Sequence, residues 1–228
     1  MQAQASPLFS EYVSDGITST KPSGWFILLV MQKPTIIAIL GMPGSGKGTV
    51  VTHICDTYHV PSVYFGGMVY EEVERRGLDI VRDERMVRED MRAQEGPAVM
   101  AKRASVHAQK ALADGAPFVI LDGVYSWSED KYLRETFGED YVSFAVIAPK
   151  SVRYERIVAR KDSHRQYTRD DIMRRDREEI ENIEKGGPIA FADYYLMNDH
   201  DIDSLKNQVK NLMQHLCDEP LGGKLEIQ

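Results

Sequence analysis

The stretch TIIAILGMPGSGKGT, residues 35–49, decides the fold of this chain. Residues 35–40 are apolar and rich in β-branched side chains, which predicts a buried strand. Residues 41–49 match the pattern G-x-x-x-x-G-K and run directly into a helix-compatible stretch. In this order of strand, glycine loop and helix, main-chain N–H groups surround a phosphate chain and the helix directs its positive end toward it. The stretch therefore predicts a phosphate-binding loop for a nucleoside triphosphate.

Lys47 is the charged residue of this loop, and we predict that its ammonium group reaches the β and γ phosphates of ATP. The alternative is a glycine turn that merely contains a lysine, but the match extends past the minimal motif and the preceding strand carries no charge. Gly48 stands where most such loops place Ser or Thr, so the nearest hydroxyl for Mg²⁺ is that of Thr49. The predicted nucleotide-binding residues of the loop are Gly41, Gly44, Ser45, Gly46, Lys47, Gly48 and Thr49.

Apolar runs and helical patterns alternate along the rest of the chain, as a parallel α/β fold requires. Four more strands are predicted at residues 60–65, 118–121, 141–148 and 194–197. The last helix carries an apolar stripe, which we interpret as core packing. Its members are Ile202, Leu205, Val209, Leu212, Met213 and Leu216. The pattern predicts one central sheet of five parallel strands.

Asp122 follows the predicted strand 118–121 and precedes Gly123. A carboxylate at the carboxyl end of a central parallel strand lies beside the phosphate-binding loop, where it can hold the water shell of Mg²⁺. The alternative is a simple turn, because Asp-Gly is also a common turn pair. We predict Asp122 as a catalytic and metal-binding residue.

The composition excludes some classes of function. The 228 residues carry a formal net charge of −7, which disfavours a general nucleic-acid-binding surface because such a surface is basic. The two cysteines, Cys55 and Cys217, lack metal-ligand spacing and fit a reducing compartment. The apolar run 25–30 is too short to cross a bilayer and has no basic segment before it. We therefore predict a cytoplasmic protein that binds neither membranes nor nucleic acid.

Both ends of the chain differ from the rest in composition. Residues 1–33 show no helical or strand periodicity, and we interpret them as a disordered or misassigned extension, with the natural start near Met31. Residues 219–228 are predicted as a flexible tail. The folded domain is then expected at 34–218.

The string Gly-Lys-Gly-Thr at 46–49 resembles the loop of adenylate-kinase-like nucleoside monophosphate kinases. Together with later segments, the chain looks closest to small archaeal-type P-loop kinases described as adenylate-kinase-like or dephospho-CoA-kinase-like, and the likeness covers most of residues 34–216. This resemblance implies a P-loop NTPase fold of three α/β/α layers that uses ATP and Mg²⁺. It also implies a helical acceptor-binding segment at 66–115 and a short lid at 161–168.

On the donor side the resemblance assigns three residues. Arg156 and Arg160 match arginines that approach the donor nucleotide and its transferring phosphoryl group, and Asn198 matches the loop beside the adenine ring. A strand-ending turn is the alternative for Asn198. Thr168 and Asp171 form a predicted capping box at the start of the next helix. This helix also carries Arg169, Arg174, Arg175 and Arg177, which either meet phosphate or belong to a salt-bridged surface.

The acceptor side departs from the family pattern. Gly67 stands where the family has Asp, and Tyr70 and Tyr125 stand where it has two phosphate-clamping arginines. Either tyrosine can stack a base or donate a hydrogen bond. Arg88 and Arg92, spaced i to i+4 in the acceptor segment, are the predicted replacements, and the alternative is that such arginines only form the solvated faces of helices.

Three hypotheses about function follow. The first is an ATP-dependent kinase that acts on a nucleoside monophosphate or related nucleotide. The second is a dephospho-CoA kinase, whose acceptor is a ribose hydroxyl and needs no phosphate clamp. The third is a non-catalytic ATP-binding regulatory protein, because of the substitutions at Gly67, Tyr70 and Tyr125. The sequence leaves the acceptor and the oligomeric state open.

Overall fold

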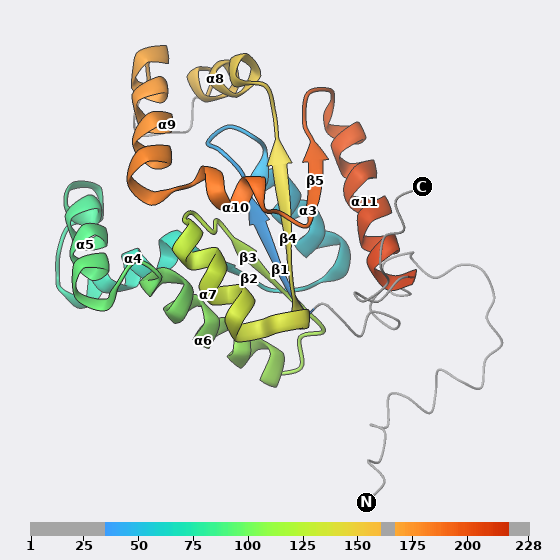
Figure 1. Cartoon of the computed structure of the whole chain (residues 1–228), viewed down its shortest axis with the longest axis horizontal. Helices are drawn as coiled ribbons and strands as arrows, with labels where there is room; N and C mark the ends of the chain where they lie inside the picture. Colours follow the sequence, from blue (N-terminus) through green and yellow to red (C-terminus); the bar gives the residue numbers. More distant parts are fainter. Residues whose placement is uncertain (1–34, 161–166, 219–228) are drawn as a thin grey trace, which may run out of the picture.

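The structure is a computed structural model that describes residues 35–160 and 167–218 (Figure 1). The predicted extension at 1–33, most of the predicted lid at 161–168 and the predicted tail at 219–228 lie outside the described residues. Within the described ranges, no helix combines the length and apolar character needed to cross a membrane.

Five parallel strands form one sheet in the order β2-β3-β1-β4-β5, which confirms the predicted sheet. The strands are β1 (Ile36–Leu40), β2 (Ser62–Tyr64), β3 (Val119–Asp122), β4 (Tyr141–Ile147) and β5 (Tyr194–Met197). Strand β2 is shorter than predicted because helix α4 (Phe65–Arg75) begins directly after Tyr64. Strand β3 is one residue longer at its end, so Asp122 belongs to the sheet.

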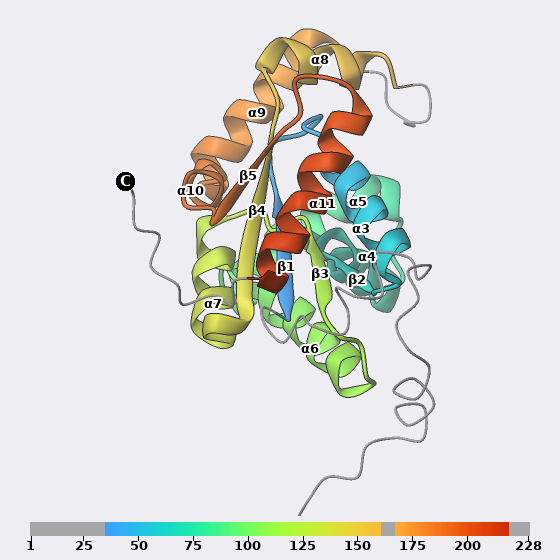
Figure 2. The same cartoon turned by 90° about the vertical axis from the view of Figure 1, so that its right-hand side faces the viewer.

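The two faces of β1 supply two separate cores, as expected for a parallel strand covered on both sides. Ile36, Ala38 and Leu40 pack with helices α4, α5 (Ile80–Glu95), α6 (Val99–Ala113) and α7 (Trp127–Phe137). Ile37 and Ile39 pack with α3 (Lys47–Tyr58) and α11 (Ile202–Asp218) on the other face, which is turned toward the viewer in Figure 2. The three-layer α/β/α fold predicted from the sequence is therefore confirmed.

Helix α11 packs on this second core with most of the predicted stripe. Leu205, Val209, Met213 and Leu216 are buried, and Leu212 packs against them. The prediction was wrong for Ile202, which is 52% exposed. Ile202 is the first residue of the helix, and it lines a surface cavity instead of the core.

Helices α4, α5 and α6 form the predicted helical segment between β2 and β3, and Glu72 ties them together. The Glu72 carboxylate accepts hydrogen bonds from Arg75 at 2.9 Å and Arg76 at 2.7 Å within α4, and from Arg103 of α6 at 3.1 Å. These hydrogen bonds hold the pKa of Glu72 well below its usual value, the largest effect coming from Arg75. The carboxylate is thus the shared counter-ion of three cations.

Replacing Glu72 with glutamine should lower the free energy of unfolding by about 1–2 kcal/mol, because three arginines lose their common anion while water still screens their exposed ends. The difference in the free energy of unfolding between wild type and the variant should become smaller at acidic pH. The lowered pKa means that this stabilisation is present above the pKa of an unfolded glutamate and is lost as the pH falls. Urea unfolding of both proteins at neutral and acidic pH measures this; an equal difference at both values would contradict it.

Above the carboxyl ends of the strands lie α8 (Lys150–Val158) and α9 (Arg169–Ile183), and the short α10 (Gly186–Ala190) lies lower, just before β5 (Figure 1). The predicted capping box of α9 is confirmed, since the Thr168 hydroxyl accepts from the Asp171 N–H at 3.2 Å. Arg153 of α8 joins α9 to the glycine loop. It donates to Asp176 at 2.6 Å and to the carbonyl oxygen of Pro43 at 2.8 Å.

Candidate active site

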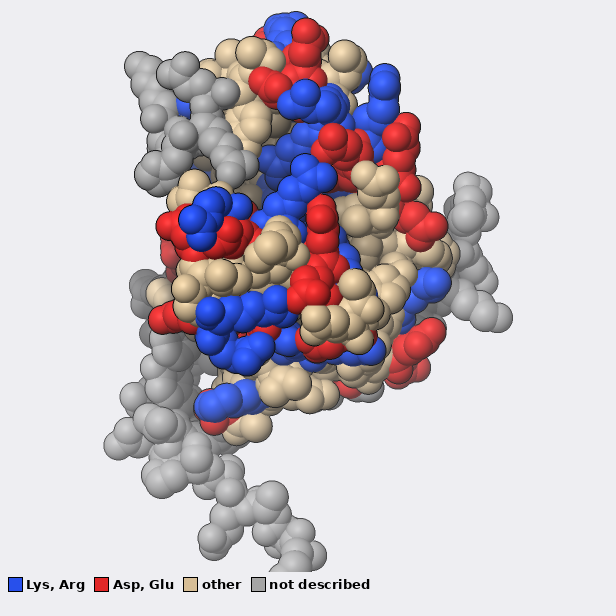
Figure 3. Space-filling model, turned by 90° about the vertical axis from the view of Figure 1, so that its left-hand side faces the viewer, with Lys and Arg blue, Asp and Glu red and all other residues tan. Residues whose placement is uncertain are grey.

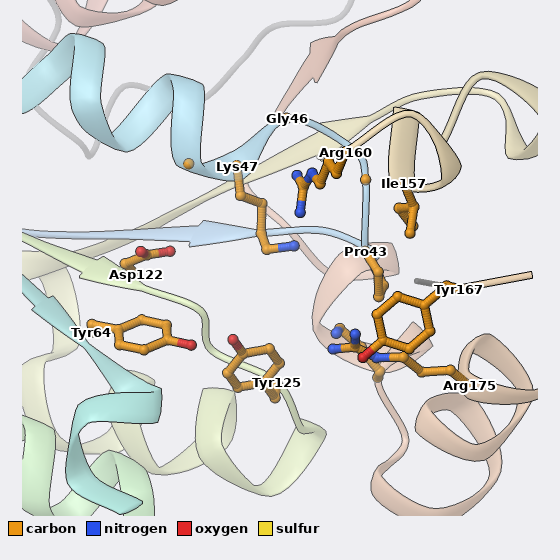
Figure 4. A pocket seen from close by; sticks show the side chains of 13 residues that line it. Pro43, Gly46, Lys47, Tyr64, Asp122, Tyr125, Ile157, Arg160, Tyr167 and Arg175 are labelled. Atoms are coloured by element: carbon orange, nitrogen blue, oxygen red, sulfur yellow. The ribbon is translucent and has the colours of Figure 1, made fainter. Parts of the chain in front are cut away.

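The strand register brings the predicted loop and Asp122 together. Asp122 of β3 pairs with Ile39 of β1 on one side and with Tyr64 of β2 on the other. The loop after β1 starts beside this row, and a cavity of about 280 Å³ lies there. Figure 4 shows side chains from several elements directed into this space. They include Lys47, Tyr64, Asp122, Tyr125, Arg160, Tyr167, Arg175 and Lys185.

The loop has the conformation that phosphate binding requires. Gly44 and Gly46 have φ of 78° and 105°, in the left-handed region that favours glycine. A Cβ at Gly46 would also overlap the side-chain amide of Asn198. Helix α3 starts directly after Gly46, so its first N–H groups point into the loop. The Ser45 hydroxyl is buried without a hydrogen-bond partner among the described residues, as expected of a loop built to receive a polar ligand.

Lys47 reaches back over the loop, where its ammonium group donates to the carbonyl oxygens of Gly41 at 2.8 Å and Met42 at 3.1 Å. Burial lowers the pKa of Lys47 to about 7, and repulsion by Lys185 adds to the effect. Glu179 and then Asp122 raise the pKa, but they do not cancel the shift. The cavity therefore holds a cation whose charge is poorly compensated, and a bound polyphosphate would compensate it.

This pKa predicts a pH dependence of ATP binding. A triphosphate favours the charged form of Lys47, so binding should raise its pKa above the free value of about 7 and take up a proton. Affinity for Mg·ATP should then be highest below neutrality and fall by up to about tenfold per pH unit above it. Calorimetry in buffers of different ionisation enthalpy measures the proton uptake. Uptake that persists in a Lys47→Met variant would contradict the assignment.

Asp122 is the carboxylate that lines this cavity. Burial raises its pKa, while the charge of Lys47 acts in the opposite direction. No group of three or more potential metal-binding side chains lies within residues 35–160 and 167–218. One carboxylate beside a phosphate site nevertheless fits Mg²⁺, which is usually held by one or two carboxylates together with substrate phosphates and water.

Thr49, the second predicted metal ligand, lines a different cavity of about 470 Å³ between α3 and α11. Thr52, His53, Asp56, Ile202 and Lys206 also line it. Gly48, near the start of α3, borders both cavities. The structure does not bring Thr49 and Asp122 into one cavity, and the metal-binding role of Thr49 stays a prediction.

Arg156 and Asn198 contact each other and the loop. The Asn198 amide donates to the Ser45 carbonyl oxygen at 2.7 Å and accepts from Arg156 at 3.2 Å. The second terminal nitrogen of Arg156 is buried without a hydrogen-bond partner in the described chain. Asn198 therefore braces the loop from β5, whereas a contact with adenine stays a prediction. Arg160 lines the cavity of Lys47, as predicted for a residue that meets the transferring group.

The predicted acceptor residues occupy different positions around the cavity. Tyr125 lines it, whereas Tyr70 stands behind Tyr64, with ring centroids 6.1 Å apart. Arg92 lies 3.7 Å from the buried Glu129, and its Nε is buried without a hydrogen-bond partner within the described residues.

Arg88 forms an ion pair with Glu84. Burial lowers the pKa of Arg88, and repulsion by Arg92 and Arg175 contributes. Figure 3 shows basic side chains crossing the face that carries α5 and α9.

Sequence reasoning missed Tyr64 and Lys185. Tyr64 lies inside the predicted strand 60–65, and the family motif that begins after it drew attention to Gly67 and Tyr70 instead. Lys185 follows α9, where Glu184 has a left-handed conformation with φ of 54° and turns the chain back. A lysine next to Gly186 and Gly187 is typical of a helix-ending turn, so the sequence carries no signal that would have singled it out.

Comparisons with known proteins agree with this architecture. A family model described as "AAA domain" matches residues 40–183. A UPF0200 protein from Thermococcus gammatolerans is 34% identical over 183 residues, which span 79% of this chain and 95% of that protein.

Two solved structures are similar in fold. The crystal structure of TT1252 from Thermus thermophilus has a TM-score of 0.58 at 22% identity and covers 81% of this chain and 98% of its own. Shikimate kinase from Bacteroides thetaiotaomicron has a TM-score of 0.52 at 16% identity, with 80% and 98% covered. The resemblance to small archaeal-type P-loop proteins is thereby confirmed, and the chain belongs to the UPF0200 family, with an AAA domain that carries the phosphate-binding loop.

Proposed function

We propose that this protein is an ATP-dependent kinase that transfers the γ-phosphoryl group to a nucleoside monophosphate or a related nucleotide. The observation that supports it is the shared cavity, in which the loop lysine Lys47 lies with Asp122, Arg160, Arg175 and Lys185. Phosphoryl transfer needs positioning and charge compensation more than covalent chemistry. Kinase function in a structural neighbour, the shikimate kinase, agrees with the proposal.

The position of each residue in the cavity indicates its role. Main-chain N–H groups from Gly44 to Thr49 would bind the triphosphate, and Lys47 would bind its β and γ phosphates. Asp122 would orient the water shell of Mg²⁺, and Mg²⁺ when bound supplies further charge neutralisation. Arg160 would compensate charge on the transferring group. The nucleoside would extend past Gly48 toward the second cavity, near Thr49 and Ile202.

The cationic surroundings favour an acceptor that carries a phosphate. Lys47, Arg160, Arg175 and Lys185 line the cavity, whereas Asp122 is the carboxylate that lines it. Arg88 and Arg92 approach from α5, where repulsion between them contributes to the lowered pKa of Arg88. They would bind the acceptor phosphate in place of the two arginines that adenylate-kinase-like kinases have at the positions of Tyr70 and Tyr125. Tyr125 would contact the acceptor directly, with Tyr70 supporting Tyr64.

A second candidate is transfer to an alcohol, as in dephospho-CoA kinase. Asp122 favours it, because this carboxylate lies in register with Tyr64 at the acceptor side and burial raises its pKa. A raised pKa suits a group that accepts a proton from the attacking hydroxyl. The third hypothesis, a regulatory protein that binds ATP without turnover, is an outcome of the same assay.

The test is ADP formation from Mg·ATP with a panel of AMP, CMP, GMP, UMP and dephospho-CoA, with Lys47→Met as the inactive control. ADP formation that depends on a nucleoside monophosphate and disappears in the variant supports the proposal. Turnover with dephospho-CoA alone selects the second candidate. Tight ATP binding with no turnover on any acceptor would replace the kinase by a regulatory protein. The cytoplasmic location is part of the proposal.

A further inference from the structure

Lys185 is a buried lysine with an unusual position. Its residue is 1% exposed, yet its side chain reaches the wall of the cavity that holds Lys47. The ammonium group forms an ion pair with Glu179 at 2.5 Å and lies 4.5 Å from the centroid of the Tyr125 ring. A buried ammonium loses hydration, so it is stable only where anions surround it.

Among the described residues, two cations of this cavity wall share one carboxylate. Glu179 also accepts a hydrogen bond from Arg175 at 2.9 Å, so one carboxylate serves two cations of the cavity wall. Lys47 is a third cation in the cavity. Among the neighbouring positive charges, that of Lys185 does most to lower the pKa of Lys47. Asp122 also lines the cavity, and Asp176, whose charge raises the pKa of Lys185, is itself paired with Arg153 at 2.6 Å. An anion placed between Lys47 and Lys185 would relieve this repulsion.

We propose that Lys185 is a catalytic residue that contacts the γ-phosphoryl group during its transfer, from the side of the cavity formed by α9 and the turn after it. This inference rests on the proposed function. In the step, an acceptor oxygen forms a bond to the γ-phosphorus while the bond to the β–γ bridging oxygen breaks, and its electron pair stays on ADP. Lys185 donates to a γ-phosphoryl oxygen and keeps its proton throughout. Glu179 positions the ammonium group.

The alternative is that Lys185 only stabilises the fold through Glu179. The two roles differ in their response to the γ-phosphate. A structural lysine affects ATP and ADP binding equally, because both nucleotides share the loop. A lysine that contacts the γ-phosphoryl group affects the triphosphate alone.

The experiment is calorimetric titration of Mg·ADP and of a non-hydrolysable Mg·ATP analogue into wild type, Lys185→Met, Lys185→Arg and the exposed control Lys110→Met. We expect Lys185→Met to weaken binding of the analogue at least tenfold, while ADP affinity changes less than twofold. Lys185→Arg should keep part of the preference because it keeps the charge. Lys110→Met removes an equal charge from α6 and should bind both nucleotides as wild type does.

If Lys185→Met does not fold, a second variant still tests the proposal. The double variant Glu179→Gln, Lys185→Met removes both partners of the ion pair, so no unpaired charge is buried, and it should show the same selective loss. Equal affinities of wild type and the variants for the analogue would overturn the role of Lys185 and leave the proposed function in place. Failure of wild type to bind either nucleotide would overturn both.

Discussion

Replacing Lys47 with methionine should weaken binding of Mg·ATP at least about 100-fold and abolish turnover, because charge-assisted hydrogen bonds to phosphate are among the strongest polar contacts. The Lys47 ammonium group has few competing partners, namely the Gly41 and Met42 carbonyl oxygens of its own loop. A triphosphate would replace them with charged oxygens. Methionine has a similar length and removes the charge alone. Calorimetry on both proteins measures the loss.

This variant should keep its fold. Burial lowers the pKa of Lys47 to about 7, which means that the folded protein disfavours the charged form. Methionine removes this penalty, so the melting temperature without ligand should stay equal or rise. Lys110→Met, at an exposed ion pair of α6, is the matched control and should bind ATP normally. Wild-type affinity in Lys47→Met would contradict the assignment of the loop.

Asp122→Asn should lower turnover by about 100-fold, a typical size for removal of one charged group that acts in the transition state. The amide keeps the shape of the side chain, but it orients the water shell of Mg²⁺ poorly. Asp122 is well placed for this role because it pairs with Ile39 directly before the loop. Initial rates over a range of Mg²⁺ concentrations are the measurement.

The comparison for Asp122→Asn is Asp114→Asn, which removes a carboxylate at the exposed end of α6. The dependence of ATP affinity on Mg²⁺ should be strong in wild type and in Asp114→Asn and weak in Asp122→Asn. If all three proteins respond to Mg²⁺ alike, Asp122 does not hold the metal.

The central part of the fold could be predicted because short stretches of sequence identify its elements. Strand β1 is apolar on both faces, so residues such as Ile37 and Ala38 identify it without knowledge of the partner strands. The glycine loop follows from its own sequence. Asp122 could be predicted because a parallel sheet places the ends of all its strands at one edge. Ile202 was misassigned because helical periodicity does not show where the covered part of a helix begins.

The side of the cavity that is formed by α9 and the turn after it could not be predicted in the same way. The position of Lys185 depends on the turn at Glu184 and on the ion pair with Glu179, and both are set by tertiary packing. Arg175 resembles Arg174 in sequence, yet Arg175 lines the cavity and Arg174 pairs with Asp171 at the surface. Helix phase relative to the sheet decides between them.

The most direct test of the phosphate-binding loop is an NMR titration of ¹⁵N-labelled protein with Mg·ADP and the non-hydrolysable Mg·ATP analogue. Main-chain N–H groups that donate to phosphate should shift strongly, so the largest changes are expected at Gly44, Ser45, Gly46, Lys47 and Gly48. Saturable binding with these shifts supports the account. No binding, or binding that leaves these five resonances in place, would contradict it.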